Sequence, residues 1–415
     1  MSQNNKPINL AKKMDYIEPF HVMRVLKRAK EMEKAGHQVI HLEVGEPDFI
    51  TPEPIITAAK KALDDGLTQY TPAAGILELR EAIANFYAVR YGVDISPERI
   101  LITPGATGAL QLVLAVLLNS GDEVLLPDPG YPCNRHYVEL YNGKPVAINT
   151  QVENRYQPTL SSIEEKWSSD TRALMLASPA NPTGSVLSKK ELLDISELVL
   201  KKSRNGQAAT LIVDEIYHGL TYEEGDDNAS ASASASASAR ISTALSLPDS
   251  ENLFVINSFS KYFGMTGWRL GWVVAPEAYV EALDRLAQNI FLCAPAPAQY
   301  AALAAFSNES IAIMEQRRSS FKKRRDFLLP ELRNLGFDIP IVPKGAFYLY
   351  ANCKNLSENS MQLASNILNN IHVAITPGQD FGRNYPEEYL RFAYTTNMEG
   401  LQIAIERLEK FLKIA

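Results

Sequence analysis

The sequence predicts an α/β fold: a large domain with a mostly parallel seven-stranded sheet covered by helices, and a smaller α+β domain. Two observations support this prediction. Short apolar stretches alternate with helical stretches from residue 77 to residue 290, which is typical of parallel strands joined by crossover helices. After residues 295–297, Pro-Ala-Pro, the helices become longer and more charged. The composition, with 46% hydrophobic and 21% charged residues in 415, is that of a protein with a sizeable core.

Seven apolar stretches are expected to form the large sheet. They are residues 100–103, 123–127, 145–148, 173–177, 210–214, 252–258 and 270–275. Helices are expected between several of them, at residues 77–91, 108–118, 189–202 and 277–290. The strands have few polar positions, as expected for a sheet that is buried on both faces.

The other elements are assigned to the smaller domain. From the C-terminal part we expect a charged helix at 298–329, extended segments at 337–342 and 346–350, and helices near 360–370 and from Asn397. The N-terminal part adds an arm with an amphipathic helix within 14–36 and a strand at 39–44. This divides the chain into residues 1–44, an arm and helix of the small domain, the large domain 45–295, and the small C-terminal domain 296–415.

Charge and composition exclude several classes of protein. The 41 basic and 48 acidic residues give a net charge of −7, so no overall positive field attracts nucleic acid or an anionic membrane. No apolar run is long enough for a membrane span, and the N-terminus lacks a signal-peptide pattern. The three cysteines show neither a disulfide framework nor a metal spacing. We expect a cytoplasmic protein without a metal, in which the Ala-Ser repeat at 229–239 forms a solvated surface loop.

The most informative segment surrounds a single lysine. Ser258-Phe-Ser-Lys261 follows a predicted strand, and Gly-Trp-Arg269 comes soon after it. A lysine amine can form a Schiff base with an aldehyde cofactor, while Ser258 and Arg269 can hold the oxygens of a phosphate. A lone lysine is usually a solvated surface residue, so the flanking residues carry this interpretation.

Three further segments also follow predicted strands. Gly105-Ala106-Thr107 opens a helix, where backbone N–H groups can bind an anion. Asn181 follows the strand at 173–177, and Asp214 ends the strand at 210–214, with Tyr217 three residues later. Ligands of open α/β sheets bind beyond the carboxyl ends of the strands. The sequence therefore predicts one shared site at this edge.

These motifs resemble those of the fold-type I, pyridoxal-phosphate-dependent class I/II aminotransferases, the aspartate aminotransferase superfamily. The resemblance runs from about Tyr16 to the C-terminus, with Asn181-Pro-Thr-Gly and Ser-Phe-Ser-Lys261…Gly-Trp-Arg269 as its most specific parts. The Ala-Ser stretch is the one clear departure. Because it lies between motifs, we expect it to leave the chemistry intact.

The resemblance implies a role for each matching residue around the cofactor. Lys261 would form the internal aldimine with pyridoxal 5′-phosphate and move the proton at the substrate Cα. Asp214 would keep the pyridine nitrogen protonated, and Asn181 and Tyr217 would bond its phenolate oxygen. The set expected to stack on the ring or hold the phosphate is Tyr131, Gly105, Ala106, Thr107, Ser258 and Arg269.

The resemblance also implies substrate contacts and a partner. Arg391 would bind the substrate α-carboxylate through its planar fork, completed by Gly45 and Asn181. Tyr70 matches a tyrosine that reaches the phosphate of the partner subunit, which implies a homodimer. Taken alone, Arg391 would be read as a surface ion pair, but its strand-like apolar neighbours favour burial.

The activity implied is amino transfer from an L-amino acid to a 2-oxo acid by a ping-pong cycle, with glutamate and 2-oxoglutarate as one pair. An alternative is a C–S β-lyase or a related enzyme of the same fold, which would share the lysine, aspartate and arginine. A second alternative is a non-catalytic regulatory module, for which we expect no room before residue 16. Some aspartate-preferring relatives place a lysine where this chain has Thr107, so the sequence favours neutral donors.

Overall fold

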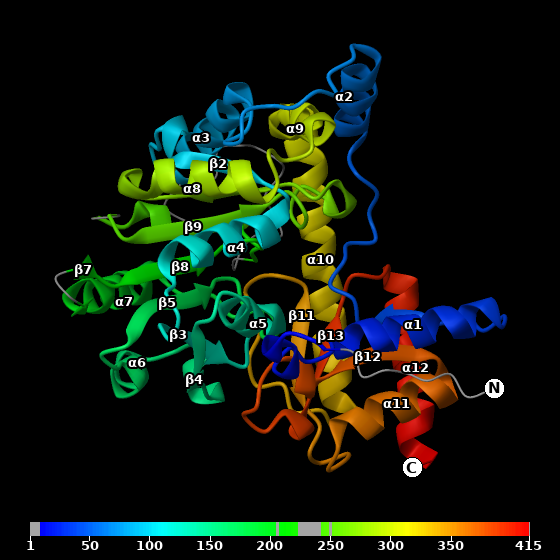
Figure 1. Ribbon diagram of the computed structural model, residues 1–415. Helices are drawn as coiled ribbons and strands as arrows, with labels where there is room; N and C mark the ends of the chain where they lie inside the picture. The colour runs from blue at the N-terminus through cyan, green and yellow to red at the C-terminus, as the bar shows by residue number, and fades with distance from the viewer. Residues whose placement is uncertain (1–8, 205–206, 223–241, 249–250, 415) are drawn as a thin grey trace, which may run out of the picture.

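The computed structural model describes residues 9–204, 207–222, 242–248 and 251–414. The Ala-Ser repeat at 229–239 lies outside these ranges. Two sheets organise the described chain, one of seven strands and one of four (Figure 1). The predicted α/β class with a seven-stranded, mostly parallel sheet is therefore confirmed. Among the described helices, none is both long and apolar enough to cross a membrane.

The seven-stranded sheet has the order β2-β10-β9-β8-β5-β3-β4. Only β10 runs antiparallel to its neighbours; the other pairs are parallel. In chain order the strands are β2 (Ile100–Thr103), β3 (Glu123–Asp128), β4 (Lys144–Asn149), β5 (Thr171–Ala177), β8 (Thr210–Asp214), β9 (Leu253–Ser258) and β10 (Gly271–Val274). Each lies within about two residues of its predicted position, because continuous apolar runs mark strands buried on both faces.

Helices cover both faces of this sheet. They are α3 (Leu77–Tyr91), α4 (Gly105–Leu117), α5 (Pro132–Leu140), α6 (Leu160–Lys166), α7 (Lys189–Lys201) and α8 (Glu277–Ile290). Alternate strand residues enter different cores: Ile212 and Ile256 pack with α4 and α8, whereas Val213 and Val255 belong to the core with α3 and α7. Two short antiparallel strands, β6 (Ser203–Arg204) and β7 (Gln207–Ala208), follow α7.

The four-stranded sheet joins both ends of the chain. Its order is β1-β12-β13-β11, formed by β1 (Ile40–Leu42), β12 (Val373–Pro377), β13 (Tyr389–Ala393) and β11 (Tyr348–Asn352). The N-terminal strand β1 pairs in parallel with β12, with Ile40 opposite Val373. Helices α1 (His21–Lys34), α11 (Ser360–Ile371) and α12 (Met398–Ile414) lie around it (Figure 1). The N-terminal arm thus completes this sheet, as the sequence suggested.

The region after residue 295 differs from the prediction in two places. The single helix expected at 298–329 is two helices, α9 (Ala296–Leu303) and α10 (Asn308–Asn334). They separate at Ser307, which has an extended backbone. Its hydroxyl caps α10 by accepting a hydrogen bond from the Ser310 N–H. Helix α9 packs beside α2 (Glu53–Asp64), while α10 runs from there to the small sheet (Figure 1). The segment 337–342 is not a strand; Asp338 makes only an isolated bridge with Asn352.

Candidate active site

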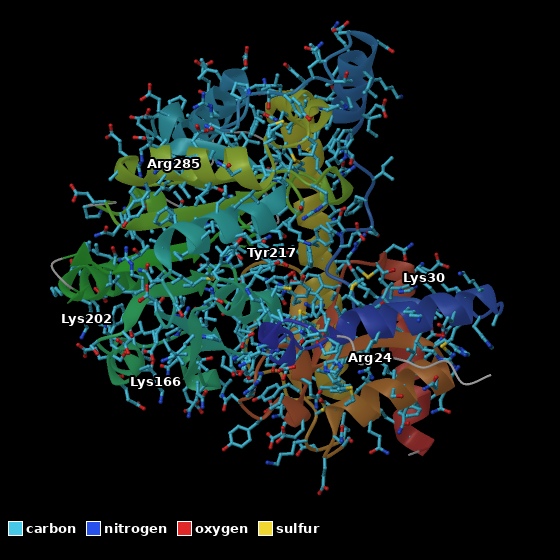
Figure 2. All side chains as sticks on the ribbon, in the orientation of Figure 1. Arg24, Lys30, Lys166, Lys202, Tyr217 and Arg285 are labelled. Atoms are coloured by element: carbon cyan, nitrogen blue, oxygen red, sulfur yellow. The ribbon has the colours of Figure 1, made fainter. Side chains whose placement is uncertain are left out.

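Three neighbouring strands bring their polar ends to one edge of the large sheet. Asp214 ends β8 and is in register with Ala177 of β5 and Ile256 of β9. Asn181 follows β5 by four residues, and Lys261 follows β9 by three. These side chains converge because parallel strands present their carboxyl ends together. Tyr217 lies near the middle of the molecule, between the two sheets, whereas labelled cations such as Lys166 lie at the periphery (Figure 2).

The lysine is enclosed. Lys261 Nζ donates a hydrogen bond to the Gly45 carbonyl oxygen at 2.7 Å, and it lies 6.0 Å from the ring centroids of Tyr217 and Phe347. Burial lowers the pKa of Lys261 to about 8; the charges of Arg391 and Arg269 act in the same direction. Nucleophilic and proton-transferring lysines need such a pKa, because only the neutral amine has a free electron pair.

Asp214 is also buried, with 4% of its surface exposed. Its Oδ1 accepts a hydrogen bond from the Ile216 N–H at 3.1 Å. Burial raises its pKa to about 7, although this N–H and the Lys261 charge oppose the shift. A buried carboxylate of this kind is well suited to pair with a cationic ring nitrogen, which would restore its charged form.

Two tyrosines and a glycine fit closely beside the lysine. The hydroxyls of Tyr217 and Tyr348 are 2.8 Å apart, and the two rings pack edge to face. A Cβ at position 45 would lie 1.7 Å from the Tyr348 hydroxyl oxygen. Only glycine therefore lets the backbone after β1 approach Tyr348 and present its carbonyl to Lys261.

Arg391 lies in β13 and faces Asn181 across the gap between the sheets. It is 3% exposed, and its Nη1 donates to Asn181 Oδ1 at 2.9 Å. Its Nη2 donates to the Glu43 carbonyl and, at 3.4 Å, to Thr376 Oγ1. The guanidinium lies between the rings of Tyr348 and Phe381, 4.3 and 4.8 Å from their centroids. Its Nε is buried without a hydrogen-bond partner, so one donor of the fork remains for a ligand.

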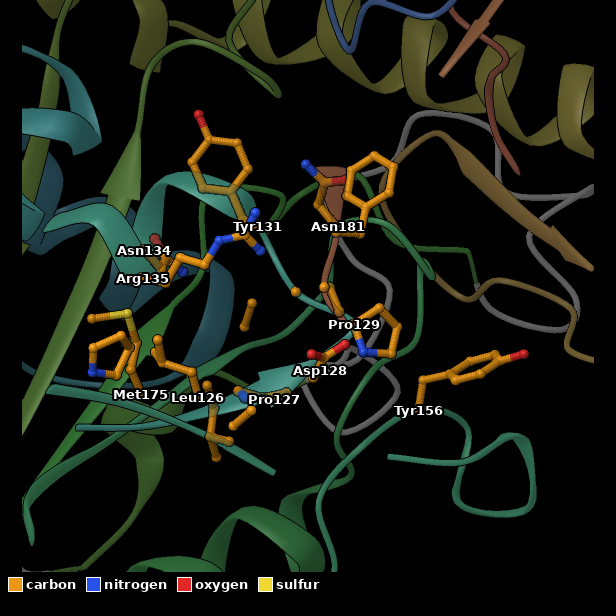
Figure 3. A pocket seen from close by; sticks show the side chains of 18 of the residues that line it. Leu126, Pro127, Asp128, Pro129, Tyr131, Asn134, Arg135, Tyr156, Met175 and Asn181 are labelled. Carbon is orange, nitrogen blue, oxygen red and sulfur yellow. The ribbon is translucent and has the colours of Figure 1, made fainter. Parts of the chain in front are cut away.

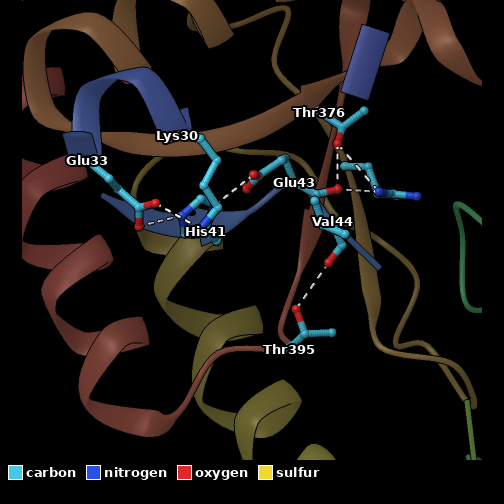
Figure 4. A network of polar contacts seen from close by, with 8 residues as sticks. Lys30, Glu33, His41, Glu43, Val44, Thr376 and Thr395 are labelled. Atoms are coloured by element: carbon cyan, nitrogen blue, oxygen red, sulfur yellow. Dashed lines mark hydrogen bonds and ion pairs between the residues drawn. The ribbon is translucent and has the colours of Figure 1, made fainter. Parts of the chain in front are cut away.

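The segment after β1, whose Glu43 carbonyl accepts from Arg391, is itself held by hydrogen bonds from side chains. His41 lies between Glu33 and Glu43, with ring nitrogens 3.0 and 2.8 Å from their carboxylates (Figure 4). The hydrogen bond to Glu43 raises the pKa of His41, against the effect of burial. Thr395 donates to the Val44 carbonyl on the next residue. The carbonyl that Arg391 contacts is therefore held in place on both sides.

The start of α4 forms a cradle for an anion. Gly105 has φ +69°, and a Cβ there would lie 2.7 Å from Arg269 Nη2. Arg269 is exposed, and Ser258 Oγ accepts from the Ser260 N–H at 3.0 Å. Tyr137, from α5, lies beside the Thr107 side chain. Backbone N–H groups, an arginine and hydroxyls at a helix N-terminus are the donors that a phosphate requires.

The last two predicted residues differ in their placement. Tyr131 is the N-cap residue of α5, and its ring meets Phe20 edge to face with centroids 6.3 Å apart. Tyr70 is 82% exposed. The structure thus brings Tyr131 to the site but leaves Tyr70 on the surface.

A pocket of about 300 Å³ adjoins the site (Figure 3). Tyr131 and Asn181 border it, together with Asp128, Arg135 and Tyr156. Lys261 is not part of its lining. The pocket therefore lies beside the lysine and shares two residues with its site.

Several contacts were missed in the sequence. Tyr348, Phe381, Thr376 and Glu43 surround Arg391, and Tyr137 joins the anion cradle. Their only signal was an apolar or β-rich neighbourhood, which predicts strands but not the partners that strands meet. Within the described ranges, no group of three or more His, Cys, Asp or Glu residues could hold a metal.

The site fits pyridoxal phosphate on its own geometry: a glycine cradle that a Cβ would fill, a buried carboxylate, and a half-buried lysine with a lowered pKa. The family model "Aminotransferase class I and II" matches residues 37–408. A (5-formylfuran-3-yl)methyl phosphate transaminase of Methanocaldococcus jannaschii is 36% identical, over 97% of this chain and 99% of the relative. A valine–pyruvate aminotransferase of Mycobacterium tuberculosis is 34% identical, over 95% and 97%.

Solved structures agree with these relatives. The crystal structure of an aminotransferase from Mycobacterium tuberculosis matches with a TM-score of 0.90 and 33% identity, over 99% of this chain and 100% of that one. Sequence, fold and site geometry therefore lead to one conclusion. The chain belongs to the class I and II aminotransferases and is a pyridoxal-phosphate-dependent transaminase.

Proposed function

We propose that this enzyme transfers the amino group of an L-amino acid to a 2-oxo acid by a ping-pong cycle, with glutamate and 2-oxoglutarate as one pair. The observation that carries this proposal is that Lys261 and Arg391 donate to two carbonyls of the same segment, those of Gly45 and Glu43. Lys261 is a half-buried amine with a pKa of about 8, and Arg391 is a buried guanidinium with a free donor. Together they can hold an α-carboxylate and move a proton at the adjacent carbon.

The residues at the strand ends would hold the cofactor. Asp214 would pair with its ring nitrogen, Asn181 and Tyr217 would bond its phenolate oxygen, and Tyr131 would stack on the ring. Its phosphate would be held by Gly105, Ala106, Thr107, Ser258 and Arg269. When bound, pyridoxal phosphate supplies a conjugated ring that accepts the electron pair left when the Cα–H bond breaks.

The chain's own residues then handle the proton and the carboxylate. Because the pKa of Lys261 is about 8, a sizeable fraction of its amine is neutral near neutral pH and can take the proton from Cα. Arg391, held by the Glu43 carbonyl and Asn181, fixes the carboxylate, so that Cα lies at one place relative to Nζ. Gly45 leaves room for this approach.

We propose that the donors are neutral amino acids. A second carboxylate on the substrate would need a further cation. Position 107, where some aspartate-preferring relatives place a lysine, holds a threonine.

We also propose a homodimer in which Tyr70 reaches the phosphate of the partner subunit. Tyr70 is 82% exposed, and large apolar side chains are exposed nearby in sequence at Ile50, Leu63 and Leu77. A partner subunit that covers this part of the surface would bury these apolar side chains. The domain division at residues 44/45 and 295/296 is part of the same proposal.

A half-reaction screen tests the activity. The cofactor-loaded enzyme is mixed with each L-amino acid in turn, without an oxo acid, while the cofactor's absorption is followed. We expect neutral amino acids to convert the cofactor to its pyridoxamine form in one turnover. Release of pyruvate and ammonia with the starting spectrum regained would instead establish a β-lyase. An unchanged spectrum with all amino acids would contradict the proposal.

A further inference from the structure

A cluster of polar side chains, of which Tyr262 is buried and the others partly buried, begins at the residue after Lys261. Tyr262 accepts a hydrogen bond from Arg90 Nη1 of α3 at 3.0 Å and donates to Glu315 Oε1 of α10 at 2.5 Å. Arg90 Nη2 donates to the same oxygen at 2.8 Å. Arg318 Nε donates to Glu315 Oε2 at 2.7 Å. We call Tyr262, Arg90, Glu315 and Arg318 the tyrosine clamp.

The clamp connects two loops that carry site residues. Gly219 has φ +93°, and a Cβ there would lie 2.5 Å from Tyr262 Cγ, so the tyrosine ring packs directly on that turn. Gly219 is two residues after Tyr217. Arg318 Nη1 donates to the Thr221 carbonyl at 3.0 Å, on the same segment. Tyr262, next to Lys261 in the lysine loop, therefore packs this loop against the loop that follows Asp214.

The clamp keeps its charges near neutral pH. Burial alone would raise the pKa of Glu315, but the charges of Arg90 and Arg318 outweigh it and lower the pKa to about 2. Tyr91 and His218 also face this region, and burial raises the pKa of Tyr91 and lowers that of His218 to about 3. Glu315, Tyr91 and His218 keep their charge states between about pH 6 and 8. Glu215 lies 3.8 Å from His218, and burial raises its pKa to about 8, but its carboxylate bonds Thr243 and Ala244 rather than Tyr262. The two partners of the Tyr262 hydroxyl, Arg90 and Glu315, therefore stay charged near neutral pH.

We propose that Tyr262 is a positioning residue for the transamination reaction: its hydroxyl, fixed by Arg90 and Glu315, holds Lys261 in place relative to Asp214 and Tyr217. This proposal rests on the proposed role of Lys261. Misplacement of a reacting group by about 1 Å can cost on the order of a hundredfold in rate. A hydroxyl anchored to two other helices limits such movement of the neighbouring lysine.

The first variant is Tyr262→Phe, which keeps the ring on Gly219 and removes only the hydroxyl. We expect kcat of the half-reaction to fall about tenfold while KM for the amino acid stays within about twofold, because Arg391 lies on another element. In the cofactor-free protein, the pH dependence of Lys261 carbamylation by cyanate, read by peptide mass spectrometry, reports the pKa of its amine. We expect it to move up, because a looser loop admits water.

Matched variants separate positioning from general damage. Glu315→Gln should reproduce both effects, and the double variant should be little worse than either single one, because both act through one hydroxyl. Tyr394→Phe is the control: Tyr394 is as buried, and its hydroxyl bonds the Ala346 carbonyl outside the clamp. It should lower the melting temperature without moving the carbamylation profile.

Two results would overturn the proposal. One is a Tyr262→Phe enzyme with wild-type kcat and an unshifted carbamylation profile; the other is full additivity of Tyr262→Phe and Glu315→Gln. Failure of the proposed function would appear in the wild type instead. Borohydride reduction with pyridoxal phosphate would then leave Lys261 unlabelled, and the clamp would have no reacting lysine to position.

Discussion

The two ends of the site use buried charge in different ways. At the large sheet, Lys261 and Asp214 each have one hydrogen bond within the described part of the chain, to the Gly45 carbonyl and from the Ile216 N–H. Burial consequently shifts both pKa values toward neutrality. At the small sheet, Arg391 has three acceptors and two flanking rings. The first end is suited to exchanging protons and the second to holding a fixed anion.

This difference predicts which residues control the reaction rate and which control substrate binding. A lysine with few partners can lose its proton because burial removes the water that would stabilise its cation. An arginine does not lose its proton in a protein, so additional partners only fix its direction. Variants at the lysine end should therefore change the rate of reaction, and variants at the arginine end should change substrate affinity.

The largest effect is expected for Lys261→Ala. Removing the amine removes the base at Cα, and we expect the half-reaction to slow by at least about 10⁴-fold. The folded protein should still bind the cofactor noncovalently. Stopped-flow absorption with the best donor amino acid measures the rate. A variant that transaminates normally would show that Lys261 has been assigned wrongly.

Asp214→Asn should expose the cost of burying the carboxylate. Unfolded aspartate loses its proton near pH 4, whereas folded Asp214 keeps it to about pH 7, so the folded state binds more protons in between. Its contribution to stability therefore falls as the pH rises from 4 to 7. In the cofactor-free protein, the variant should gain on the wild type over that range, by at most about 4 kcal/mol. Urea unfolding at pH 4.5 and 7.5 measures this gain.

The exposed Asp94→Asn serves as its control, with no comparable pH-dependent gain expected. If the stability difference between Asp214→Asn and wild type were the same at both pH values, burial would not raise the carboxylate pKa. The proposed shift of pKa values toward neutrality at the Lys261–Asp214 end of the site would then be wrong.

Arg391→Lys should act on binding. A lysine cannot reproduce the planar fork between Tyr348 and Phe381, so we expect kcat/KM to fall by about 10²-fold, mostly through KM. Saturation kinetics of the half-reaction separate the two parameters. An unchanged KM with a lower kcat would place Arg391 in the chemical step instead.

The smallest effect is expected for Gly45→Ala. Its Cβ would lie 1.7 Å from the Tyr348 hydroxyl oxygen, so the tyrosine must move and the contact to Tyr217 weakens. We expect about a tenfold loss in kcat/KM, partly restored by adding Tyr348→Phe, which removes the clashing oxygen. Steady-state kinetics of the two variants test this. A double variant no better than Gly45→Ala would place the damage elsewhere.

The sequence predicted the fold better than the contacts. Continuous apolar runs located all seven large-sheet strands, because a strand buried on both faces leaves a local pattern. The break at Ser307 was missed because the alanine-rich residues before it favour a helix and no glycine or proline marks the break. Tyr348 and Thr376 were missed for a different reason. They matter because they contact Arg391 and Gly45, which lie far from them in the sequence. A local sequence pattern does not predict such long-range contacts.

One measurement tests the contrast between the two ends most directly. Single-turnover half-reactions of Lys261→Ala and Arg391→Lys are followed at rising concentrations of the best donor amino acid. We predict that Arg391→Lys approaches the wild-type rate at saturation, whereas Lys261→Ala stays at least about 10⁴-fold slower at every concentration. A Lys261→Ala enzyme that recovers at high substrate concentration, or an Arg391→Lys enzyme that never does, would contradict it.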